Sequence, residues 1–173
     1  MTSCCPQRAE ESRAGLHEKQ AEQLYRRAES VGAGEGGAVG WDRAGGPRVR
    51  ITRDNLVYVC DRMNNRVQVF KKSGEFVRQF VYEPDTRGSG SVWDLVPSED
   101  PSQRYLLVAD GTNNEVRITL RETGEVIGSF GRPGRQAGDF HWVHNIAVDA
   151  WGSVYTSEVD TGKRAQRFVR VLQ

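Results

Sequence analysis

The chain has 173 residues, enough for one ordinary domain, and its 24 Lys and Arg residues nearly balance its 23 Asp and Glu residues. The net charge of +1, with arginines scattered along the chain, gives no reason to expect a nucleic acid partner. No apolar run approaches the ~18 residues of a membrane helix, so no membrane span is expected. The segment Met1–Pro6 lacks the basic start and apolar stretch of a signal peptide, which predicts a cytoplasmic location for the chain as written.

The first 46 residues differ in composition from the rest. Residues 9–30 are rich in Glu, Gln, Arg and Ala, which predicts a marginal helix with only a thin apolar stripe. That stripe consists of Leu16, Ala21, Leu24, Tyr25 and Ala28. Residues 31–40 are rich in glycine and are expected to form a flexible linker. We therefore expect residues 1–46 to form a helical or disordered segment that carries no chemistry and makes few contacts with the remainder.

From residue 47 onward, short apolar runs are bounded by Gly, Asp and Asn, which is the pattern of β-strands. No segment of this region has a convincing helical period. The expected strands, in chain order, are 49–51, 56–60, 66–70, 76–80, then 92–96, 106–109, 116–120, 126–130, and finally 145–148, 154–157 and 165–171.

These strands belong to a repeat. Apolar runs end in an acid at Asp61, Asp110 and Glu158, which lie 49 and 48 positions apart. The segments Gly74–Phe80 and Gly124–Phe130 both begin with Gly-Glu, end in Phe and lie 50 positions apart. A period of 40–50 residues with about four short strands is typical of a propeller blade, so we expect an all-β fold. The expected blades are about 47–82, 90–131 and 138–173. Because the three acids are equivalent by repeat, a structural role is favoured for them over catalysis.

The segment Leu56–Phe80 resembles the NHL repeat, whose pattern V-Y-V-A-D-x-x-N-x-R-V-Q-V-F-x-x-x-G-E-F it matches almost throughout. The resemblance covers about residues 47–173 and implies a partial propeller, about three four-stranded blades of an expected six. Within that family, Gly138–Asp149 is most similar to peptidyl-α-hydroxyglycine α-amidating lyase and its bacterial relatives. The resemblance implies full-length relatives that are secreted or periplasmic.

The same resemblance implies where a site would lie. In the lyases, histidines that lead into several blades converge on a central zinc, and a calcium holds the blades together. The corresponding positions here are Pro47, the neighbourhood of Trp93, and His144, so His144 is the single candidate metal ligand. A catalytic zinc takes about three protein ligands, so this chain alone is expected to bind neither zinc nor another cofactor tightly. The alternative for His144 is a polar residue that lines the channel.

Candidate ligand-binding residues lie on the face built by the loops that lead into the blades. They are Trp93, His141, Trp142 and Asn145. Aromatic residues at such positions bind ligands in some propellers and pack between blades in others. No Ser/His/Asp or Cys/His arrangement can be argued, so the sequence names no catalytic residue.

Three functions remain open. The first is a binding scaffold, whose ligand would be a peptide, a protein or a small molecule. The second is a section of a metal-dependent carbon–nitrogen lyase of the peptidylamidoglycolate type. The third is a chain without a function of its own. An incomplete ring also leaves open blade faces and unpaired strand edges, through which the chain could associate with itself.

Overall fold

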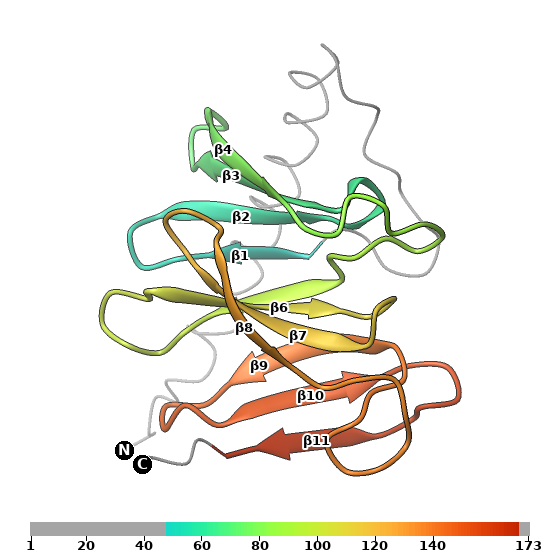
Figure 1. Cartoon of the computed structure of the whole chain (residues 1–173). Helices are drawn as coiled ribbons and strands as arrows, with labels where there is room; N and C mark the ends of the chain where they lie inside the picture. The colour runs from blue at the N-terminus through green and yellow to red at the C-terminus, as the bar shows by residue number, and fades with distance from the viewer. Residues whose placement is uncertain (1–47, 170–173) are drawn as a thin grey trace, which may run out of the picture.

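The computed structural model describes residues 48–169, in which eleven strands form three antiparallel sheets stacked in chain order (Figure 1). The first sheet contains β1 (Val49–Ile51), β2 (Leu56–Asp61), β3 (Arg66–Lys71) and β4 (Phe76–Val81). The second sheet contains β5 (Asp94–Pro97), β6 (Tyr105–Asp110), β7 (Glu115–Leu120) and β8 (Val126–Phe130). The third sheet contains β9 (Val143–Val148), β10 (Val154–Glu158) and β11 (Ala165–Phe168).

Each sheet is a meander, in which consecutive strands are neighbours. In the first two sheets, the turns between the second and third strands use the same residue type, because Asn65 and Asn114 both take a positive φ, of 56° and 61°. A single 3₁₀ turn, η1 (Arg62–Asn64), precedes the first of them. The all-β fold, with two sheets of four strands and a third of three, confirms the architecture that the repeat predicts.

Most expected strand boundaries match within one residue, but two strands begin two residues away from the expected position, and the strand expected over 165–171 ends at Phe168. The strand expected over 145–148 begins two residues earlier, at Val143. A bulge causes this difference, because Asn145 pairs with Ser157 while Val143 pairs with Glu158. His144 is therefore the extra residue of the bulge. The strand expected over 92–96 begins at Asp94. The predictions made for residues 1–46 lie outside the described residues.

The core lies between the sheets and comes from the two faces of each central strand. Leu106 and Val108 of β6 pack in one buried cluster with Tyr58 of β2. The intervening residue Leu107 belongs to a second buried cluster, together with Ile146 of β9. Because successive residues of a strand point to opposite faces, a strand between two sheets must be apolar on both. This explains the continuous apolar run of β6.

The repeated acids hold the turn that follows each second strand. Asp61, Asp110 and Glu158 have almost no exposed side-chain surface, and each is paired with an arginine from the strand or turn that follows. The nitrogen–oxygen distances are 2.7 Å to Arg66, 2.5 Å to Arg117 and 2.6 Å to Arg164. A buried carboxylate is costly without a charged or hydrogen-bonding partner. The same acid–arginine ion pair therefore stabilises the corresponding turn in each of the three sheets.

Asp100 organises the loop between β5 and β6. Its carboxylate accepts hydrogen bonds from the hydroxyl groups of Ser98 and Ser102 and from the backbone N–H of Arg104 at 3.1 Å. These bonds, with that from the Ser102 hydroxyl the strongest cause, lower the pKa of Asp100 from 3.8 to about 2.

We expect the substitution Asp100→Asn to cost stability only above about pH 4. A carboxyl group whose pKa is lowered by folding stabilises the protein above its unfolded pKa of 3.8, and this contribution is lost as the pH falls toward about 2. Thermal unfolding midpoints of the variant and the wild type, followed by circular dichroism between pH 2 and 7, would measure this difference in stability. Asp85→Asn, at an exposed carboxylate, is the matched control and should follow the wild type. A difference between Asp100→Asn and wild type that does not change with pH would contradict this assignment.

Candidate functional site

Rings from residues far apart in the sequence meet at one end of the stacked sheets. The ring centroids of Trp93 and Trp142 are 5.8 Å apart, and those of Trp93 and His144 are 5.5 Å apart in an edge-to-face arrangement. His141 lies almost parallel to Trp142, at 5.7 Å and an interplanar angle of 7°. Four of the residues predicted from the sequence thus form one contiguous cluster, which we call the ring cluster.

Trp93 is the buried centre of the ring cluster, with 5% of its surface exposed. Its indole Nε1 donates to the carbonyl of Gly90 at 2.8 Å, and the Arg62 guanidinium lies 3.8 Å from the ring centroid. The ring also lies against Gly111, where a Cβ atom would come within 2.4 Å of it. Trp93 therefore joins η1 of the first sheet to the second and third sheets, and its role includes packing between blades.

Trp142 is the exposed member, with 39% of its surface accessible. Its φ of 51° is uncommon for a bulky residue. Two hydrogen bonds hold this conformation: its N–H donates to Asn114 Oδ1 at 2.7 Å, and its carbonyl accepts from the N–H of Val159 at 3.2 Å. The indole is thus presented to solvent in a fixed position, by residues of two different sheets.

Both the backbone and the imidazole ring of His141 have hydrogen-bonding partners. Its backbone N–H donates to Glu158 Oε2 at 2.9 Å, and its Nε2 lies 3.2 Å from Asp160 Oδ2 and 3.1 Å from Thr161 Oγ1. The hydrogen bond to His141 is the main reason why the pKa of Asp160 is lowered from its usual value. The imidazole, the neighbouring indole and the Asp160 carboxylate therefore form a preorganised group with both aromatic and charged character.

His144 of the ring cluster and Asn145, the fifth predicted residue, both lie in β9. His144 Nδ1 is 2.7 Å from Asn145 Oδ1, so these side chains are partners. Between residues 48 and 169, no group of three or more His, Cys, Asp or Glu side chains is placed to hold a metal ion.

Asp94 is a polar centre that the sequence reasoning missed. The carboxylate is fully buried and accepts from Arg50 Nη2 at 3.0 Å, from the N–H of Leu95 at 2.9 Å and from the N–H of Ile146 at 3.1 Å. It thereby connects β1, β5 and β9, the first strands of the three sheets. Burial raises the pKa of Asp94, although Arg50 and the two amides act in the opposite direction. The sequence did offer a signal for this centre, because Asp94 is a charged residue inside the apolar strand expected over 92–96.

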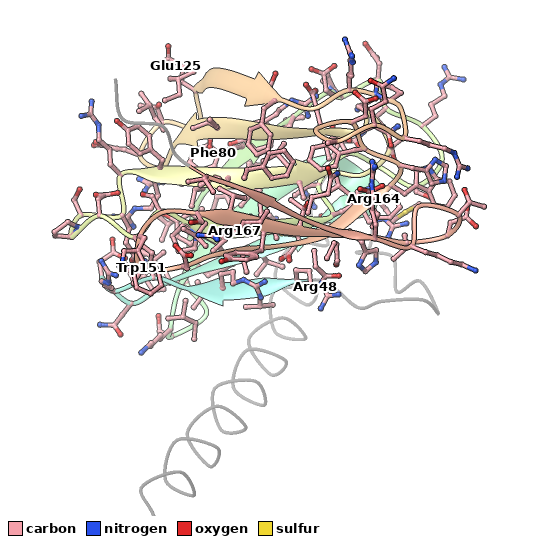
Figure 2. All side chains as sticks on the ribbon, turned by 90° about the horizontal axis from the view of Figure 1, so that it is seen from below. Arg48, Phe80, Glu125, Trp151, Arg164 and Arg167 are labelled. Atoms are coloured by element: carbon pink, nitrogen blue, oxygen red, sulfur yellow. The ribbon has the colours of Figure 1, made fainter. Side chains whose placement is uncertain are left out.

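The ring cluster lies at one particular end of the sheets. Figure 2 shows Trp151 and Arg164 at opposite ends of the strands. Glu158 accepts from Arg164 Nε at 2.6 Å and from the N–H of His141 at 2.9 Å, so the cluster lies at the end marked by Arg164. Trp151, which is 85% exposed, is separate from it and provides an internal reference for experiments.

Comparisons with known proteins concern the fold alone. No protein-family model and no curated protein matches the sequence. Solved structures with a similar fold include hydrazine synthase from Kuenenia stuttgartiensis (14% identity, TM-score 0.55), a protein of unknown function from Bacteroides caccae (12%, 0.52) and streptogramin B lyase (14%, 0.50). The matches cover 72%, 67% and 72% of this chain but only 34%, 39% and 40% of those chains.

The repeated meander and these likenesses define the class of the chain as a β-propeller fold, of which residues 48–169 supply three blades. The NHL assignment and the likeness to amidating lyases stay predictions. Within the described residues, no helix is long and apolar enough to cross a membrane.

Proposed function

We propose that this chain is a section of an NHL-type propeller that acts as a binding scaffold, with its ligand on the ring cluster. The observation that carries this proposal is the exposed indole of Trp142, stacked on His141 and held at a positive φ by Asn114. Such a conformation costs about 1–3 kcal/mol and persists only where surrounding contacts enforce it, which is common at ligand sites.

The chemistry of the ring cluster indicates what it binds. An exposed indole offers its face to aromatic rings and to cations, and the neighbouring carboxylate of Asp160 adds attraction for a positive charge. The Trp142 ring contacts Trp93, which is itself packed against the Arg62 guanidinium, so the surface is rigid before the ligand arrives. Rigid aromatic surfaces bind with little loss of conformational freedom. Aromatic or cationic groups of a peptide, a protein or a small molecule fit this description.

The second candidate is a section of a metal-dependent lyase of the peptidylamidoglycolate type. It is favoured by His144, which occupies the extra position of a bulge at the point where the resembling lyases place a zinc ligand. A zinc site would need further donors in addition to His144. Two more histidines at equivalent positions in a longer form of the protein would favour this candidate over the scaffold.

The scaffold is tested with the four tryptophans as reporters. In protein labelled with 5-fluorotryptophan, we expect benzamidinium, a planar aromatic cation, to shift the ¹⁹F signal of Trp142 saturably, with a Kd of about 1 mM. The signal of Trp151 should stay in place, because Trp151 lies at the other end of the sheets.

Two substitutions serve as the matched pair in that titration. Trp142→Ala should abolish the saturable response at the remaining signals, whereas Trp151→Ala, at an even more exposed indole, should leave the Trp142 response unchanged. Equal shifts at Trp142 and Trp151, or a response that survives Trp142→Ala, would contradict a ligand site on the ring cluster.

A further inference from the structure

The carboxylate of Asp160, beside the ring cluster, keeps capacity for a ligand. Its side chain is 52% exposed, and its Oδ2 lies 3.2 Å from His141 Nε2. Lys163 lies close enough for its charge to contribute to the lowered pKa of Asp160, but among residues 48–169 it forms no ion pair with that carboxylate. A carboxylate has about four acceptor sites, so Asp160 can bind a further donor from solvent.

The exposure of this position does not depend on the sheet being the third. Asp160 is the second residue after Glu158, the acid that ends β10. The residues at the same position in the first two sheets are Met63 and Thr112, and each of those sheets is followed by another. Met63 is nevertheless 46% exposed and Thr112 is partly exposed. The turn after each second strand is thus a surface that remains accessible when a further sheet packs beside it.

The ring cluster offers one flat exposed ring close to this carboxylate. Trp142 is 39% exposed and nearly parallel to His141, whereas Trp93 is almost fully buried. The N–H of Val159 donates to the carbonyl of Trp142, which brings the residue that follows Val159, Asp160, next to the indole. A tetrahedral ammonium group is bound best by several ring faces that surround it, but a planar guanidinium stacks on a single one. A single exposed indole beside a carboxylate therefore fits a planar cation.

The chain already contains both contacts that such a cation would make. The guanidinium of Arg62 lies 3.8 Å from the ring centroid of Trp93. The guanidinium of Arg66 donates from Nε to Asp61 Oδ2 at 2.7 Å. Arginine combines these contacts because its guanidinium is flat, always charged and carries its N–H donors in a fork that matches a carboxylate.

We propose that the ring cluster and Asp160 bind a guanidinium group, that of an arginine side chain or of a small guanidinium compound. The indole of Trp142 stacks on the plane of the cation, and the carboxylate of Asp160 accepts its N–H donors. Planarity and charge are both required, so the site selects guanidinium over a primary ammonium and over a neutral urea. This inference rests on the function proposed above and names the class of ligand for the same site.

Three matched peptides test this selectivity on the whole chain labelled with 5-fluorotryptophan. We expect Ac-Gly-Arg-Gly-NH₂ to shift the ¹⁹F signal of Trp142 saturably. The lysine peptide keeps the charge without the planar fork and should bind at least about fivefold more weakly. The citrulline peptide keeps the planar shape without the charge and should bind at least about tenfold more weakly. Methylguanidinium distinguishes the two sources: affinity equal to that of the arginine peptide indicates a small compound, and weaker binding indicates arginine within a protein.

Two substitutions in the turn after β10 should change the affinity for the arginine peptide in opposite directions. Asp160→Asn removes the charge and should weaken binding by at least about fivefold. Lys163→Asn removes a competing cation and should strengthen binding by about twofold. Both residues have a positive φ, which asparagine tolerates, so the turn is retained. Asp85→Asn, at an exposed carboxylate between β4 and β5, is the control and should bind like the wild type.

The benzamidinium titration separates this inference from the function on which it rests. If benzamidinium shifts Trp142 but the three peptides bind alike, guanidinium recognition is overturned and the scaffold stands. The same conclusion follows if Asp160→Asn binds the arginine peptide as tightly as the wild type does. If neither benzamidinium nor the arginine peptide shifts Trp142, both proposals are overturned.

Discussion

Replacing Asp94 by alanine is expected to lower the free energy of unfolding by at least about 3 kcal/mol. The substitution leaves the Arg50 guanidinium and the N–H groups of Leu95 and Ile146 without their acceptor. The amides lie in buried backbone, where an unsatisfied donor carries its full desolvation cost. Since these partners belong to three different sheets, the loss should weaken the contact between the first strands of all three. Urea unfolding followed by tryptophan fluorescence measures the change.

The matched control for Asp94 is Asp85→Ala. Asp85 is also an aspartate between β4 and β6, but its side chain is exposed, so its replacement should change stability by less than about 0.5 kcal/mol. Amide chemical shifts of Ile146 and Arg50 provide a second readout, because both should move in Asp94→Ala and stay unchanged in Asp85→Ala. A loss below about 1 kcal/mol for Asp94→Ala would show that the carboxylate does not join the sheets.

The substitution Gly90→Ala is expected to cost at least about 3 kcal/mol or to displace the segment before β5. A Cβ atom at this position would lie 1.8 Å from the carbonyl oxygen of Arg62, a backbone atom that cannot rotate away. Gly90 also has a positive φ of 70° and accepts the Trp93 indole hydrogen bond. The ring cluster should therefore loosen together with the fold. Urea unfolding and the near-ultraviolet circular dichroism of the tryptophans report the two effects.

The substitution Gly88→Ala distinguishes the cost of the steric clash at Gly90 from the cost of a positive φ. Gly88 has a similar φ of 76°, but a Cβ atom there would meet nothing within 4 Å. Its replacement should cost only the about 1–2 kcal/mol of placing a non-glycine residue in the left-handed region, and the near-ultraviolet spectrum should keep the wild-type shape. If both glycine substitutions gave the same loss and the same spectrum, close packing against Arg62 would not be the reason for Gly90.

The candidate residues were found from the sequence because the repeat marks positions. Trp93, Trp142 and His144 all stand just before or at the start of a blade, and the structure brings their rings into contact. Their different roles could not be predicted in this way. Trp93 is buried between sheets, whereas Trp142 is exposed, and the difference depends on the hydrogen bond that the Trp142 N–H donates to Asn114 and on the Arg62 guanidinium beside the Trp93 ring. Those partners lie 28 and 31 positions away in the sequence.

The sequence by itself determined the period, the strands and the order in which they pair. These properties are local, because alternation, apolar runs and turn residues act within a few positions, and repetition of the pattern then implies repeated sheets. Only the tertiary structure decided which polar groups meet between sheets. Asp94 finds Arg50 at 44 positions and Ile146 at 52, in neighbouring sheets. The period places these residues in the first strands of the three sheets, but contact between them depends on how the stacked sheets bring those strands together.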